Sequence, residues 1–145
     1  MMVQDKISLP DPHARLSPTE NGRQTCVLLA EDDRALRRFL EVVLERAGYR
    51  VIPASDGLEA MKAALSAPID VVVTDAMMPN LSGHEFCRFL RSSPALSHLP
   101  VILLSALERR ETNGGEQADA FLAKPVSGER LIECIEELLA RTSKT

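Results

Sequence analysis

The sequence predicts an α/β protein in which a parallel sheet of five strands is covered by helices on both faces. Five short apolar runs alternate along the chain with segments whose apolar residues recur every three or four positions. Because these runs are apolar throughout, they are typical of strands buried on both faces. The right-handed crossovers that join parallel strands place helices on both sides of such a sheet.

Length and composition narrow the class of protein. The 145 residues correspond to one domain with one core. A net charge of −4, without a run of lysine or arginine, gives no support to direct nucleic-acid binding. No stretch has the length of a membrane span, and the amino-terminal region lacks the apolar segment of a signal peptide. We therefore expect a cytoplasmic protein that does not bind membranes.

Residues 1–24 contain several prolines and no sustained periodicity, so we expect a disordered leader there. The domain is expected to cover residues 25–142, followed by a short tail at 143–145. The three cysteines are far apart and lack a C-x-x-C pair, which favours buried thiols over disulfides or metal ligands. They are Cys26, Cys87 and Cys134.

The first half of the domain begins with a strand at 25–30 and a helix at 34–47, which Gly48 is placed to end. The apolar stripe of this helix consists of Leu36, Phe39, Leu40, Val43, Leu44 and Ala47. A short strand follows at 50–53, and Asp56 can cap the next helix. The apolar residues of that helix are Leu58, Met61 and Leu65.

The second half contains the central strand at 69–74, a helix at 82–90 and strands at 100–104 and 118–123. The helix at 82–90 has one apolar face, formed by Phe86, Phe89 and Leu90. Ser127 can cap a last helix. Its apolar face is formed by Leu131, Ile135, Leu138 and Leu139.

The segment between Ser105 and Lys124 contains a pair of adjacent glycines, which disfavours a long helix. Gly114 and Gly115 lower helical propensity by roughly 1 kcal/mol each. We therefore expect a shortened or mobile fourth helix.

Polar residues stand at the ends of four of the predicted strands. Asp75 closes the run 71–74, and the acidic run 31–33 follows the first strand. Ser105 and Lys124 end two later strands. The carboxyl ends of parallel strands meet at one edge of the sheet, where open α/β folds bind ligands. Acids, a hydroxyl and a lysine that converge on one aspartate indicate a phosphoryl-transfer site.

Four motifs in this order carry a resemblance to a known family. They are L-L-A-E-D-D, D-A-M-M-P-N-L-S-G, V-I-L-L-S-A and F-L-A-K-P, each at a strand end. From about residue 25 to 141 the chain resembles the CheY-like receiver domain of two-component response regulators. The resemblance implies a flavodoxin-like, doubly wound (βα)5 fold. It also implies a phosphoacceptor switch rather than an enzyme. A partner histidine kinase or phosphotransfer protein would phosphorylate one aspartate, and this would change contacts with a downstream protein target.

The same resemblance implies roles for individual residues. Asp75 would be the phosphoacceptor, Lys124 would place a positive charge on a phosphoryl oxygen, and Ser105 would donate its hydroxyl. Pro125 would follow a cis peptide bond. Phe121 would be the switch aromatic that turns inward when Ser105 moves, although plain core packing explains a phenylalanine there equally well.

Magnesium is the expected cofactor, since a carboxylate and a phosphoryl group repel each other without a cation. By resemblance, Asp32 binds the ion directly, Glu31 acts through water, and Asp75 and the backbone carbonyl of Met77 complete the set. If Glu31 and Asp32 are the metal-binding pair, Asp33 is left to cap the following helix. The alternative pair, Asp32 with Asp33, would leave that helix without an acidic cap.

Two other classes of function are weighed against the switch. An aspartyl-phosphate-forming phosphatase of the haloacid dehalogenase type would need a second aspartate at Met77. A phosphorylation-independent interaction module would not require the full set of site residues. His13, His84 and His98 are expected on the surface or in loops. No output domain follows the last helix, so we expect a stand-alone receiver or one excised from a longer protein.

Overall fold

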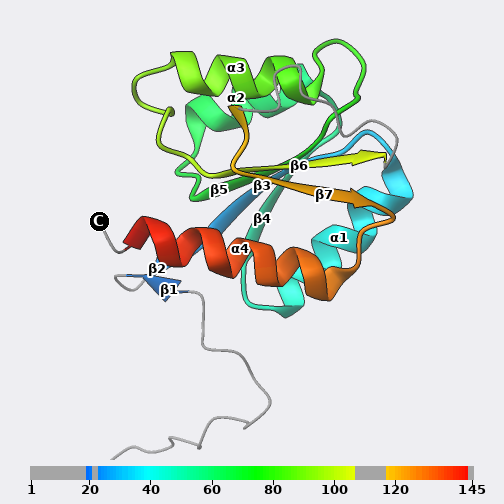
Figure 1. Cartoon of the computed structure of the whole chain (residues 1–145), viewed down its shortest axis with the longest axis vertical. Helices are drawn as coiled ribbons and strands as arrows, with labels where there is room; N and C mark the ends of the chain where they lie inside the picture. The colour runs from blue at the N-terminus through cyan, green and yellow to red at the C-terminus, as the bar shows by residue number, and fades with distance from the viewer. Residues whose placement is uncertain (1–18, 21–22, 107–116, 144–145) are drawn as a thin grey trace, which may run out of the picture.

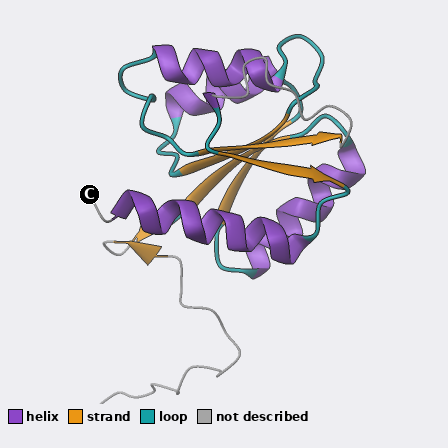
Figure 2. Ribbon diagram, in the orientation of Figure 1, coloured by secondary structure: helices purple, strands orange, loops and turns teal. Residues whose placement is uncertain are grey.

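The computed structural model describes residues 19–20, 23–106 and 117–143. A five-stranded parallel sheet, in the order β4-β3-β5-β6-β7, lies between two pairs of helices (Figures 1 and 2). The strands are β3 (Cys26–Ala30), β4 (Arg50–Ala54), β5 (Val71–Asp75), β6 (Val101–Ala106) and β7 (Ala120–Lys124). The helices are α1 (Arg34–Arg46), α2 (Gly57–Ser66), α3 (Gly83–Ser92) and α4 (Gly128–Ser143). This architecture confirms the predicted doubly wound, flavodoxin-like sheet.

The sheet has an apolar core on each face. Helices α1 and α4 cover one face, where Leu40 and Ile135 pack among alternate strand residues such as Val73. Helices α2 and α3 cover the other face, where Phe86 packs near Val72. Successive strand residues therefore enter opposite cores, as the two-residue repeat of a strand requires.

The predicted helix termini are confirmed. Asp33 and Asp56 cap α1 and α2 by accepting backbone hydrogen bonds from the first turn. Ser127 Oγ accepts a hydrogen bond from Arg130 N at 3.0 Å and so caps α4. Gly48, with φ of 100°, follows the end of α1.

Small residues, rather than the two leucines, form the buried face of α2. Leu58 and Leu65 are 49% and 67% exposed, whereas Gly57, Ala60 and Ala64 are buried. A Cβ at Gly57 would overlap the carbonyl oxygen of Leu81, so the neighbouring loop lies directly against the helix. Only a stripe of small residues permits this close approach, which turns the leucines toward solvent.

The face of α1 was predicted more closely. Leu40 and Leu44 are fully buried, and the rest of the stripe packs against them apart from Phe39, which is 49% exposed. Phe39 lies at the edge of the stripe. The helix therefore buries a narrower face than its sequence indicates.

The amino-terminal residues meet the domain at the edge of the sheet where the strands begin. Strands β1 (Thr19–Glu20) and β2 (Arg23–Gln24) form an antiparallel pair within the segment that we expected to be a leader. Gln24 Nε2 donates a hydrogen bond to the carbonyl of Gly48 at 2.7 Å. Residues 1–18 and 107–116, and with them most of the leader and the expected fourth helix, lie outside the described residues. Among the helices described, none has the length and apolar character of a membrane span.

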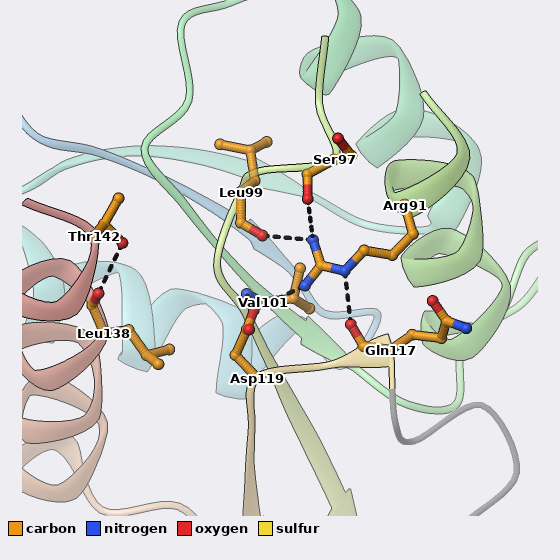
Figure 3. A network of polar contacts seen from close by, with 8 residues as sticks. All are labelled: Arg91, Ser97, Leu99, Val101, Gln117, Asp119, Leu138 and Thr142. Atoms are coloured by element: carbon orange, nitrogen blue, oxygen red, sulfur yellow. Dashed lines mark hydrogen bonds and ion pairs between the residues drawn. The ribbon is translucent and has the colours of Figure 1, made fainter. Parts of the chain in front are cut away.

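Arg91 joins three separate segments at the edge of the sheet where the strands begin (Figure 3). Its Nε donates to Gln117 O at 2.8 Å, and its Nη1 donates to Ser97 O and Leu99 O at 3.0 and 2.7 Å. Its Nη2 pairs with Asp119 Oδ2 at 2.8 Å. The planar fork of arginine suits this set of acceptors, and lysine cannot reproduce it.

Loss of the Arg91 side chain is expected to destabilise the domain. In Arg91→Ala, three carbonyls and one carboxylate lose a hydrogen-bond donor. We therefore expect the free energy of unfolding to fall by about 2 kcal/mol. Arg91→Lys should recover only part of that loss. The check is urea denaturation, with Arg88→Ala on the exposed side of the same helix as the control. Equal stability of Arg91→Ala and Arg88→Ala would contradict the expectation.

Candidate functional site

Three charged side chains meet where β3, β5 and β7 end. Lys124 Nζ lies 3.0 Å from Asp75 Oδ2 and 3.3 Å from Glu31 Oε1. The side chain of Glu31 is fully buried, and that of Asp75 is 7% exposed. This edge is also the topological switch point, because the chain leaves β3 and β5 toward opposite sides of the sheet.

Three carboxylates form the acidic cluster of this site. One oxygen each from Glu31, Asp32 and Asp75 lies within 4.8 Å of the others. Asp33 has a different position, since its Oδ1 accepts a hydrogen bond from Leu36 N at 3.0 Å in the first turn of α1. The geometry therefore matches the register in which Glu31 and Asp32 form the acidic pair.

Glu31 has an unusual electrostatic environment. Burial raises the pKa of Glu31 to about 7, and the charge of Asp75 acts in the same direction. The hydrogen bond from Asp33 N to Glu31 Oε2 and the charge of Lys124 oppose this shift. Burial is thus the main reason that Glu31 holds its proton more tightly than an exposed glutamate does.

The lysine is held in its charged form. Burial by itself lowers the pKa of Lys124, but the hydrogen bond and charge of Asp75, together with the charge of Glu31, outweigh burial and raise it. Lys124 is followed by a cis peptide bond to Pro125, as the resemblance implied. Ser105, near the end of β6, is buried, and its Oγ has no hydrogen-bond partner among the residues that the structure describes.

The donor set fits a magnesium ion. Glu31 Oε1 is buried and forms an ion pair with Lys124 Nζ at 3.3 Å, beside the carboxylates of Asp32 and Asp75. One oxygen from each of these three carboxylates lies within 4.8 Å of the others, which is a spacing at which one cation could contact all three. Hard oxygen ligands of this kind are those that magnesium prefers.

The loop between β5 and α3 frames the other side of the site. Met77 N donates to Asp75 Oδ1 at 3.3 Å, which places the Met77 backbone beside the aspartate. A Cβ on Gly83 would overlap the carbonyl oxygen of Asp75, so glycine lets α3 begin directly against the strand. Ser82 and Glu85 form a capping box that closes the loop.

The remaining sequence candidates lie away from the acidic cluster. Phe121 is 42% exposed on β7. All three cysteines are buried free thiols, as expected. His98 is in a loop, but His84 lies within α3 and is half-buried, so its prediction was only partly right. His13 lies outside the described residues.

Sequence reasoning missed two residues that support the site. Arg37 Nη1 donates to the carbonyl of Glu31 at 2.8 Å and so holds the acidic loop against α1. Asn80 Nδ2 donates to Asp56 Oδ2 at 3.1 Å and joins two loops of the site. The position of Arg37 on the apolar side of α1 was a signal that could have identified it. Nothing in the sequence indicated the role of Asn80.

Comparison with known proteins identifies the family. Residues 27–136 match the family model of the response regulator receiver domain. The chain belongs to this family. Receiver domains of two-component response regulators act generally as signalling switches, interact with histidine kinases or phosphotransfer partners, and bind magnesium in their acidic pocket.

Individual relatives agree with this assignment. The transcriptional regulatory protein GltR of Pseudomonas aeruginosa is 36% identical over 128 residues, which are 86% of this receiver domain chain and 52% of GltR. The chain thus spans about half the length of this relative.

Solved structures have the same fold. The receiver domain of Francisella response regulator 1452 has a TM-score of 0.75 at 35% identity and covers 82% of this chain and 99% of its own. The response regulator TrrA of Thermotoga maritima, solved in complex with Mg2+ and BeF, has a TM-score of 0.73 at 28% identity, covering 79% and 99%.

Proposed function

We propose that Asp75 accepts a phosphoryl group from the histidine of a partner kinase or phosphotransfer protein. The observation that carries this proposal is the position of its carboxylate, which is buried at the end of β5 and bonded to Lys124 at 3.0 Å. Glu31 and Asp32 complete the acidic cluster around it. Phosphorylation would then change the contacts of the domain with a downstream protein.

The chemistry follows from the residues present. An oxygen of Asp75 attacks phosphorus, the bond from phosphorus to the donor breaks, and its electron pair leaves with the donor, so that an acyl phosphate forms. The ammonium group of Lys124, which pairs with Asp75 before the reaction, then also donates a hydrogen bond to a phosphoryl oxygen. The buried hydroxyl of Ser105 donates to the same group.

Magnesium would supply the charge that offsets repulsion between the carboxylate and the phosphoryl group. Asp32, Asp75 and the carbonyl of Met77 would hold the ion directly, and Glu31 would act through water. The buried carboxylate of Glu31 belongs to the acidic cluster, which supports this set.

We assign the conformational response to Ser105 and Phe121. Movement of the buried hydroxyl toward the phosphoryl group vacates space that the ring of Phe121 can enter. In the structure this ring is 42% exposed, which leaves it free to turn inward.

Treatment with acetyl phosphate and magnesium tests the proposal. Intact-protein mass spectrometry should detect one added phosphoryl group that is lost in alkali, and a chelator should prevent its addition. Absence of the adduct would favour the alternative, a phosphorylation-independent interaction module on the same fold.

The phosphorylated state is expected to be long-lived. Met77 stands two residues after Asp75 and presents an apolar side chain that cannot orient an attacking water. Its side chain is 53% exposed, so a polar replacement could reach that water. Met77→Asn should speed decay at least about tenfold, or ~1.4 kcal/mol of barrier.

The decay of the phosphoprotein, followed by mass spectrometry, measures this effect. Met77→Leu is the matched control, because it keeps the apolar bulk and should decay as the wild type does. Equal decay in Met77→Asn and Met77→Leu would contradict the shielding role. We propose the same role for Leu107, which stands two residues after Ser105 and lies outside the described residues.

A further inference from the structure

We infer that Asn80 is a positioning residue for the magnesium site. By bonding to Asp56, it holds the loop between β5 and α3, and with it the carbonyl of Met77, in the position that the ion requires. This inference rests on the proposed function, in which Met77 contributes a ligand from that loop.

The conformation of Asn80 is the first observation. Its φ of 73° lies in the left-handed region, which asparagine tolerates better than most residues other than glycine. From this conformation its Nδ2 reaches Asp56 Oδ2 at 3.1 Å, across 24 residues of sequence. A backbone turn alone does not require this side-chain bond.

Asp56 is a rigid anchor for the bond. Its Oδ1 accepts a hydrogen bond from Glu59 N at 2.8 Å and caps α2, while its Oδ2 binds Asn80. The two oxygens of one carboxylate therefore serve the helix and the loop separately. Next to it, Gly57 lies against the carbonyl of Leu81, which brings the loop close to the start of α2.

The ends of the loop are secured in other ways. Ala76 N donates to Leu104 O at 2.8 Å, and Gly83 N donates to Ala76 O at 2.9 Å. The stretch between them is more exposed. In the described part of the chain, the side-chain hydrogen bond that connects residues 77–80 to another loop is the one made by Asn80. Without it, Met77 N would keep its bond to Asp75 Oδ1 and Met78 its packing on the core, but the Met77 carbonyl would be held less tightly.

Magnesium is sensitive to such variation because it demands near-ideal octahedral geometry. A ligand on an untethered loop must be ordered when the ion binds, and this ordering weakens affinity. A role confined to the turn would instead be met by any residue that adopts a positive φ. Replacement by glycine separates the two roles.

The test measures magnesium affinity of the unphosphorylated chain by NMR titration. Asn80→Gly should weaken magnesium binding about threefold to tenfold, the range expected for one lost hydrogen bond. It should also speed amide exchange at residues 77–81 in the metal-free protein. Gln24→Ala, which removes a similar exposed bond at the opposite edge of the sheet, should leave affinity unchanged.

A double-mutant cycle with Asp56→Ser links the effect to the bond, because serine keeps a cap for α2. The double variant should bind magnesium no more weakly than Asp56→Ser alone. Wild-type affinity in Asn80→Gly, or additive losses in the cycle, would overturn the inference and leave the proposed function intact. A wild-type chain that binds no magnesium would instead overturn both.

Discussion

Asp75→Asn is expected to abolish phosphorylation by acetyl phosphate in the presence of magnesium. The substitution removes the nucleophilic oxygen but keeps the shape of the side chain, so the fold should persist. Lys124 retains Glu31 as its ion-pair partner at 3.3 Å. Mass spectrometry of the intact protein measures the adduct, and circular dichroism checks the fold.

Asp33→Asn is the matched control for this experiment. It makes the same chemical change at a neighbouring acid, and asparagine caps a helix as well as aspartate does. Asp33→Asn should therefore be phosphorylated normally. Stable incorporation of a phosphoryl group in Asp75→Asn would show that another residue is the acceptor.

Asp32→Ala should have the second largest effect, through the metal. Loss of an outer-shell partner already weakens metal binding roughly 10–100-fold, so loss of a direct ligand should cost at least about 100-fold. The exposed carboxylate of Asp32 belongs to the acidic cluster, which supports this role. Magnesium titration of the unphosphorylated protein measures the change.

Asp33→Ala distinguishes the two possible registers of the acidic run. Because Asp33 caps α1, its removal should cost ~1 kcal/mol of stability and leave magnesium affinity largely unchanged. A stronger loss of affinity in Asp33→Ala than in Asp32→Ala would reverse the assignment.

Sequence patterns predicted the sheet, its helices and the position of the site. The apolar runs are long enough to specify buried strands, and parallel strands necessarily end at one edge. The sequence therefore predicts that Asp75 and Lys124, at the ends of two such strands, lie close together. Caps such as Asp33 and Asp56 were also predictable, because capping is a local interaction within one turn.

The orientation of α2 could not be predicted in the same way. Leu58 and Leu65 have the spacing of a buried face, and so do Ala60 and Ala64. Hydrophobicity alone favours burial of the leucines. The close approach of Leu81 to Gly57 instead leads to burial of the small residues. The periodicity of α2 alone cannot show this contact, because Leu81 belongs to a different segment of the chain.

By itself, the sequence determined that this chain forms a doubly wound sheet with an acidic site at the ends of its strands. The apolar periodicity and the alternation of strands with helices along the chain are both visible in the sequence. The tertiary structure alone decided that Glu31 is fully buried beside Lys124, that Arg91 joins three segments, and that Asn80 bonds to Asp56. Burial and such contacts depend on which distant segments become neighbours. Many of the acceptors involved are backbone carbonyls, which every residue supplies and no sequence pattern marks.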